Sequence, residues 1–368
     1  MVILAVILFI SSLVLSVVLT AVAKRLAFGR GFSAKPSVDR FGERVVPLGG
    51  GVAIFACLGF FMAGGIILVK LLAQSGYLNW LGEFVTIHIE GFVSKIPELV
   101  IVIAAAGALC LLGLWDDIKH LRPSTKLIVQ FIVALTVAVG ANVRVELFIT
   151  NRIVASLLSA FWIVLIINTF NFLDNMDGAS GGIAAITVAI LFVMAVLSGQ
   201  VFVGALSIVF VGTLLGFLIF NFCPASIYMG DAGSFVVGFF VAILTLRTTY
   251  YHQAQSGRWY AVLTPLVIMA LPLYDFISVT ILRIAQGKSP FVGDTQHFSH
   301  RLKKRGLSET QTVLTLYLAT LCTGAGAIVL SQVSAAYAIL IFVQTVMILA
   351  IIAVLETAGR NDGASARL

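Results

Sequence analysis

An acidic pair stands out at the end of an apolar run near the first third of the chain. Asp116 and Asp117 are adjacent, and neighbouring carboxylates repel each other unless a positive group lies close. The pair therefore suits a metal ligand or a general base. The alternative is a solvated helix terminus that Lys119 and Arg122 neutralise.

Amides and carboxylates recur at every third position further along the chain. The series is Asn168, Asn171, Asp174 and Asp177, and Gly178 closes it. A spacing of three places such residues close to one helical face, where polar groups are costly to bury unless they are paired. Their oxygens suit a hard divalent cation and phosphate ligands. The alternative is a capping cluster, although capping needs only one such residue.

A third motif, residues 228–234, places an acid between glycines. Asp231 lies between Gly230 and Gly233, and Tyr228 precedes them. Exposed N–H groups at a helix start bind phosphate, the acid could hold Mg²⁺, and the tyrosine could stack on a base. The alternative is an acid that caps a helix in a tight turn.

Histidines and cations follow one another in a late loop, residues 287–305. His297 and His300 could bind zinc, but no cysteine or third histidine is near. Recognition of phosphate through Arg301 fits better. The alternative is a basic loop that only sets the membrane orientation.

These motifs belong to a chain that composition assigns to a membrane. Of its 368 residues, 60% are hydrophobic and 11% are charged, against about 25% charged in a soluble domain. Because about 20 apolar residues cross a bilayer, we predict one all-α polytopic domain, residues 1–356, and a polar tail, residues 357–368. The eleven apolar runs are 2–22, 49–69, 99–114, 124–141, 153–169, 181–198, 201–220, 233–248, 260–283, 311–331 and 334–355.

Positive charge is uneven between the two sets of loops. The loops 23–48, 115–126, 168–180, 221–232 and 284–310, with Arg283 and the tail, hold 17 of the 23 Lys and Arg residues. The positive-inside rule places this set, which carries the motifs, in the cytoplasm. We therefore expect the N-terminus outside and the C-terminus inside. The net charge is +7, but the sequence lacks the basic runs interleaved with aromatic residues that would favour binding of nucleic acid.

Taken together, the motifs resemble those of the polyprenyl-phosphate N-acetylhexosamine-1-phosphate transferases. The resemblance runs from about Lys35 to Leu307 and rests on the acidic pair, the Asn/Asp series, the MGDAGS segment and the late histidine loop. Lys35-Pro36, the GKSPF segment (287–291) and the odd span count favour the branch that uses UDP-N-acetylglucosamine. The alternative is the phospho-MurNAc-pentapeptide transferase branch, which typically has ten spans and a histidine triplet.

The resemblance implies a reaction and roles for the residues. The phosphate of undecaprenyl or another polyprenyl phosphate would attack the β-phosphate of a UDP-N-acetylhexosamine and release UMP, in the first membrane step of cell-surface glycan synthesis. Mg²⁺, or Mn²⁺ in its place, would be held by Asp231, with Asn171 and Asp174 helping. Asp116 would act as the base, Asp117 would contact metal or phosphate, and Asp174 would share in catalysis; a covalent aspartyl intermediate stays open.

Further residues are implied to bind substrate. Phosphates would be bound by His297, His300 and Arg301, the uridine by Tyr228 and Asn221, and other parts of the substrates by Lys35 and Asn168. The resemblance also implies a bacterial cytoplasmic membrane, an active site on its cytoplasmic face, and compatibility with a homodimer.

The sequence departs from the family pattern at three places, one of which is the basic segment of the first loop, altered around Asp39 to Arg44. Asn175 stands where the family's DGxDG motif has its first glycine, and Ser299 stands where the late HxHH motif has a histidine. The rival is a cation-coupled transporter, whose site would lie near the midplane of the membrane. Only Asp275 lies inside a predicted span, and we expect it to form a structural ion pair with Arg283.

Overall fold

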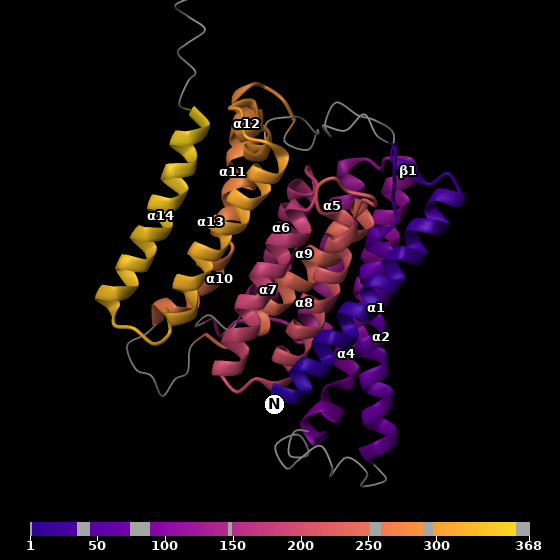
Figure 1. Cartoon of the computed structure of the whole chain (residues 1–368). Helices are drawn as coiled ribbons and strands as arrows, with labels where there is room; N and C mark the ends of the chain where they lie inside the picture. The colour runs from indigo at the N-terminus through magenta and orange to yellow at the C-terminus, as the bar shows by residue number, and fades with distance from the viewer. Residues whose placement is uncertain are drawn as a thin grey trace, which may run out of the picture.

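Long apolar helices run alongside one another and make up nearly all of the regular structure (Figure 1). The computed structural model describes residues 2–34, 45–73, 89–145, 149–250, 259–289 and 297–357. Ten of the helices within these ranges are long and apolar enough to cross a membrane, which confirms the all-α, multi-pass prediction. They are α1 (Val2–Gly29), α2 (Gly50–Ala73), α4 (Ile89–Lys119), α5 (Pro123–Gly140), α6 (Arg152–Leu173), α7 (Ala179–Leu197), α8 (Val201–Asn221), α9 (Gly230–Arg247), α13 (Glu309–Val329) and α14 (Ala335–Thr357).

The predicted span 260–283 is broken. A 3₁₀ turn (Trp259–Leu263) leads into α10 (Thr264–Ile268), and α11 (Ala270–Ala285) leaves at an angle of 65°. Pro272 has no N–H and so cannot bond the carbonyl of Ile268, four residues before it, which weakens the helix at this point. Counted as one span, the broken pair gives the eleven that the sequence predicts.

Helix α9 lies at the centre of the bundle, where it packs against α4, α6 and α2. Two glycines allow its first turn to approach the neighbouring backbones. A Cβ at Gly51 would lie 2.1 Å from the backbone nitrogen of Gly233, and a Cβ at Gly113 would lie 2.4 Å from that of Ala232. Small residues at such contacts let membrane helices pack closely, so the start of α9 is fixed by backbone contacts on two sides.

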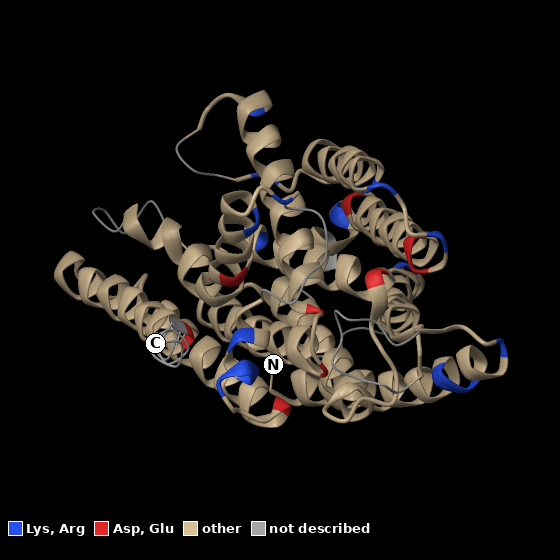
Figure 2. Cartoon of the chain, turned by 90° about the horizontal axis from the view of Figure 1, so that it is seen from above, with Lys and Arg blue, Asp and Glu red and all other residues tan. Residues whose placement is uncertain are grey.

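The loops that carry the motifs gather at the upper end of Figure 1, opposite the N-terminus. Two short antiparallel strands, β1 (Ser33–Ala34) and β2 (Val46–Pro47), lead into α2, and Leu48 bridges to Tyr228 just before α9. The late loop contains a helix that the sequence did not predict, α12 (Phe298–Lys304). Viewed from above, charged residues are few and most of the ribbon is neither basic nor acidic (Figure 2). That this end faces the cytoplasm stays a prediction.

Candidate active site

Asp117 caps the helix that begins with the MGDAGS motif. Its Oδ1 accepts the backbone N–H of Asp231 at 2.8 Å, and its Oδ2 accepts that of Ala232 at 3.3 Å. Gly230 has a φ of +70°, and a Cβ there would lie 2.6 Å from Asp117 Oδ2, so only glycine fits. The cap is thus supplied from α4, which leaves the carboxylate of Asp231 to point elsewhere.

Asp116 and Asp231 share the ammonium group of Lys126. Lys126 Nζ lies 2.6 Å from Asp116 Oδ2 and 3.5 Å from Asp231 Oδ2, while Asp116 Oδ1 accepts the N–H of Leu121 at 2.6 Å. The side chain of Asp231 is 26% exposed and that of Asp116 only 6%. Asp231 is therefore the acid that a ligand can reach more easily.

Sequence reasoning missed Lys126, which it counted only as one of the cations of a cytoplasmic loop. The signal that could have found it is Pro123, which occupies the first turn of α5, a position that proline favours. The chain turns back there after α4, so a residue one turn into α5 comes level with the acids at the end of α4. The bond from Lys126 to Asp116 is the result.

Asn171 holds Asp231 from the opposite side. Its Nδ2 donates to Asp231 Oδ1 at 2.9 Å and lies 3.0 Å from Ser234 Oγ. One oxygen of the Asp231 carboxylate therefore accepts from the Asn171 amide of α6, and the other accepts from Lys126 of α5. Three helices thus fix the orientation of one partly exposed acid.

The charges of this cluster fit a hard divalent cation. When both are ionised, Asp116 and Asp231 carry two negative charges, and Lys126 is their shared partner in the described ion pairs. The charge of Asp117 faces the positive end of α9. One carboxylate charge thus exceeds the single ammonium, and Mg²⁺ typically takes one or two protein carboxylates together with oxygens of its substrate.

The prediction that the Asn/Asp series lies on one helical face is wrong beyond Leu173. Helix α6 ends there, and Asp174 occupies the C-cap position. Asn168 donates to Gln130 Oε1 of α5 at 2.7 Å, and Asp177 Oδ2 accepts the N–H of Ala225 at 2.8 Å. The residues of the series therefore contact several different elements. Among their described bonds, that of Asn171 is the one to Asp231.

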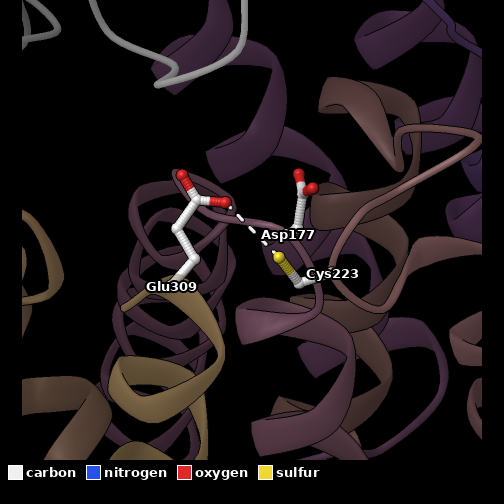
Figure 3. A group of neighbouring side chains, drawn as sticks. All are labelled: Asp177, Cys223 and Glu309. Carbon is white, nitrogen blue, oxygen red and sulfur yellow. Dashed lines mark hydrogen bonds between the residues drawn. The ribbon is translucent and has the colours of Figure 1, made fainter. Parts of the chain in front are cut away.

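Asp177 belongs to a second cluster, with Cys223 and Glu309 (Figure 3). The thiol of Cys223 donates to Glu309 Oε2 at 3.3 Å, and Lys303 pairs with the other oxygen. Burial and the neighbouring Glu309 raise the pKa of the Cys223 thiol, so it stays protonated at neutral pH. A protonated thiol is a poor metal ligand, and the cluster reads as a set of hydrogen bonds that joins the loops.

The two residues implied to contact uridine lie at the end of α8 and in the segment between α8 and α9. Asn221 is buried; its Oδ1 accepts the N–H of Gly178 at 3.2 Å and its Nδ2 donates to the carbonyl of Ile227 at 2.9 Å. Tyr228 is held through its backbone, which bonds Pro47 and Gly50. Asn221 therefore shapes the loop before α9, and contact of either residue with uridine stays a prediction.

His297 bridges an acid and an arginine of α11. Its Nδ1 lies 2.9 Å from Asp275 Oδ2, and its Nε2 lies 3.5 Å from the guanidinium of Arg283. Asp275 Oδ1 accepts the N–H of Phe298 at 3.0 Å, and the ring of His297 meets that of Phe172 edge to face. His297 thus links Asp275 to Arg283, and the direct ion pair that the sequence predicts between these two residues stays a prediction.

The other residues implied to bind phosphate are engaged within the protein. Burial and the nearby His297 lower the pKa of His300 to about 4, so at pH 7 it can hydrogen-bond but carries no positive charge. Arg301 lies 3.1 Å from Glu356 of α14 and donates to Ser278 at 3.0 Å. Their contacts with substrate stay predictions, and Lys35 lies outside the described residues.

Comparison with known proteins gives one family and several relatives. The model of glycosyl transferase family 4 matches residues 99–249. A probable undecaprenyl-phosphate N-acetylglucosaminyl 1-phosphate transferase of Bacillus subtilis (strain 168) is 29% identical over 353 residues, which cover 94% of this chain and 90% of the relative. Undecaprenyl-phosphate α-N-acetylglucosaminyl 1-phosphate transferases of Yersinia pestis, at 25% identity, and Escherichia coli (strain K12), at 24%, each match over 81% of this chain and 76% of their own length.

Proposed function

Because the chain belongs to glycosyl transferase family 4, we propose that it transfers N-acetylglucosamine 1-phosphate from UDP-N-acetylglucosamine to undecaprenyl phosphate. The names of its relatives in Bacillus subtilis and Yersinia pestis support the acceptor and the transferred group. The observation that carries the proposal is the cluster of Asp116, Asp231 and Lys126 at the end of the bundle. It offers carboxylates for a cation at the start of α9.

The reaction joins two anions. A phosphate oxygen of the lipid attacks the β-phosphorus of the donor, a new P–O bond forms, and the bond to UMP breaks as UMP leaves. Asp231 would hold Mg²⁺, with Asn171 and Asp174 helping, and the ion would supply charge neutralisation and orientation of the leaving group.

The remaining roles follow from the contacts. Asn171 and Lys126 fix the direction of the Asp231 carboxylate, and Asp117 fixes the helix that carries it. Asp116 is our candidate to take a proton from the lipid phosphate; it would have to exchange its bond with Lys126 or Leu121 for one with the lipid. Such preorganisation lowers the barrier because little rearrangement is needed when charge moves.

The decisive experiment is release of UMP. Purified protein with Mg²⁺, UDP-N-acetylglucosamine and undecaprenyl phosphate should form UMP and the lipid-linked product. Absence of UMP with every UDP-N-acetylhexosamine, including UDP-N-acetylgalactosamine and UDP-MurNAc-pentapeptide, would overturn the proposal. Preference for the pentapeptide donor would instead support the other branch of the family.

Two charge-neutralising variants test the site. Asp231→Asn should lose at least about 100-fold in kcat, the order expected when a group essential to transition-state stabilisation is removed, while the protein still inserts. Glu98→Gln is the matched control, because Glu98 pairs with Arg247 at the other end of α4. Full activity of Asp231→Asn would remove Asp231 from the metal site.

The proposed enzyme works at the cytoplasmic face of the bacterial inner membrane, where nucleotide sugars are found. Lys119 and Arg152 are exposed at opposite ends of the bundle. In a cysteine-free background, Lys119→Cys should react with an impermeant maleimide only from the cytoplasmic side and Arg152→Cys only from outside. The reverse pattern would contradict the orientation.

A further inference from the structure

Two positions at which the sequence departs from the family pattern touch each other. Ser299 Oγ donates to Asn175 Oδ1 at 2.7 Å, although 124 positions separate the two residues. Ser299 is 2% exposed, so this hydroxyl is enclosed by protein. The contact joins the turn after α6 to the first turn of α12.

The amide of Asn175 is engaged at both ends. While its oxygen accepts from Ser299, its Nδ2 donates to the carbonyl of Phe172 at 2.6 Å. The ring of Phe172 in turn meets His297 edge to face and lies 4.9 Å below the guanidinium of Arg283. The bond from Ser299 therefore belongs to the surface on which the histidine loop rests against the end of α6.

Each residue of the pair depends on the other. A glycine at position 175 would remove the acceptor and leave the hydroxyl of Ser299 without this bond inside the protein, which is unfavourable. A histidine at position 299 would add an imidazole ring where the side chain is almost fully enclosed and the amide of Asn175 is in contact, and such overpacking forces neighbours to shift. Either family-typical residue alone thus conflicts with its neighbour.

We propose that Asn175 and Ser299 are a matched pair of positioning residues that holds α12 against the acidic end of α6, in place of the glycine and histidine of the family pattern. This inference rests on the proposed function, since it assigns the pair to that site. The bond orients His297 and His300, which flank Ser299, relative to Asp174, which precedes Asn175. Neither member of the pair is assigned contact with the reacting atoms.

A double-mutant cycle tests the coupling. Ser299→Ala and Asn175→Gly should each lower kcat/KM for the donor about tenfold, the size expected for loss of one buried hydrogen bond. The kcat/KM of the double variant should be no lower than that of the less active single variant. Losses that multiply, so that the double variant falls about 100-fold, would show that the residues act independently and would overturn the proposal.

Four further variants separate a positioning role from general damage to the protein. Ser299→Thr keeps the hydroxyl and adds one methyl group, so it should lose less activity than Ser299→Ala, and Asn175→Gly combined with Ser299→His should be more active than Ser299→His alone. Thr320→Val is the control, because Thr320 is buried and its hydroxyl donates to the carbonyl of Leu316 in its own helix.

The kinetic constants give the sharpest distinction. Loss of positioning should raise the KM for the UDP-sugar, whereas partial unfolding would lower the apparent kcat and leave KM unchanged; a change in kcat alone would contradict the proposal. If the unmodified protein releases no UMP, the proposed function fails, but the same cycle can be run on the melting temperature. Additive shifts in melting temperature would then overturn the pairing by itself.

Discussion

The N–H of Asp231 is bonded to the carboxylate of Asp117, 2.8 Å away and 114 positions earlier in the chain. The adjacent acids of the pair therefore have different tasks. Asp117 builds the start of α9, while Asp116 faces Lys126 and through it Asp231. The pair reads as one motif in the sequence, but its members act on different groups.

Removal of the cap should weaken the protein. We expect Asp117→Ala to reduce the free energy of unfolding by about 1 kcal/mol, the usual size of a lost helix cap. Asp117→Asn keeps one side-chain oxygen as acceptor and should lose less. Melting curves of the detergent-purified proteins measure both, and equal melting of Asp117→Ala and the unmodified protein would contradict the cap.

Loss of the Lys126 ammonium, which Asp116 and Asp231 share, should change the dependence of activity on Mg²⁺. In Lys126→Met, two carboxylates would face each other without their ammonium, and such a pair attracts a divalent ion more strongly. We expect half-maximal activity at a lower Mg²⁺ concentration, together with a lower kcat because Asp231 is less well fixed. Lys95→Met is the control, since Lys95 pairs with Glu98 far from the site. An unchanged Mg²⁺ titration of UMP release would exclude this role for Lys126.

Gly51 packs so closely against α9 that one added methyl group there should destabilise the protein. Gly51→Ala would bring a Cβ within 2.1 Å of the α9 backbone, so the helices must move apart, at a typical cost of about 1–3 kcal/mol. Gly59→Ala, in the same helix, meets nothing within 4 Å and should melt like the unmodified protein. If both variants behaved alike, the packing of α2 on α9 would not be a constraint.

Acid should destabilise the protein through His300. Its pKa is about 4 when folded and 6.5 in the unfolded chain, so between these values the unfolded chain takes up a proton that the folded chain does not. Stability should therefore fall as pH drops from 6.5 towards 4, with no further loss from this residue below that.

The slope of melting temperature against pH measures the effect. His300→Gln should flatten the curve between pH 6.5 and 4.5, whereas His120→Asn, at an exposed site, should leave it as it is. A curve that keeps its slope in His300→Gln would assign the acid sensitivity to other groups.

The sequence predicted the helices well because a bilayer demands long apolar runs, and few other patterns satisfy that demand. The break at Met269 was not predicted because the segments on both sides of it are apolar, and Pro272 is the residue that marks the bend. Helix α12 was missed because its seven residues are largely basic and polar. Its position depends on bonds to distant residues such as Asp275 and Asn175.

The placement of the candidate site residues could be predicted only in part. Acidic motifs at one end of the bundle were evident from loop alternation, and Asn171 was found by its spacing. Lys126 was not found, because nothing local distinguishes it from a cation that sets orientation. Nor could periodicity show where α6 ends; the chain leaves the helix after Leu173, so the later acids turn towards other partners.

The central place of α9 has a consequence for how the protein is made. Among the ten helices long enough to span, α9 has the lowest mean hydropathy and the largest buried share. Alone in lipid it would be the least stable of them, since its first turn carries Asp231 and its glycines offer little apolar surface. Its insertion should therefore depend on α4 and α6, which are synthesised before it. Asp231 would take its final position in the bilayer only once those neighbours are in place, so assembly of the candidate site and insertion into the membrane would be one event.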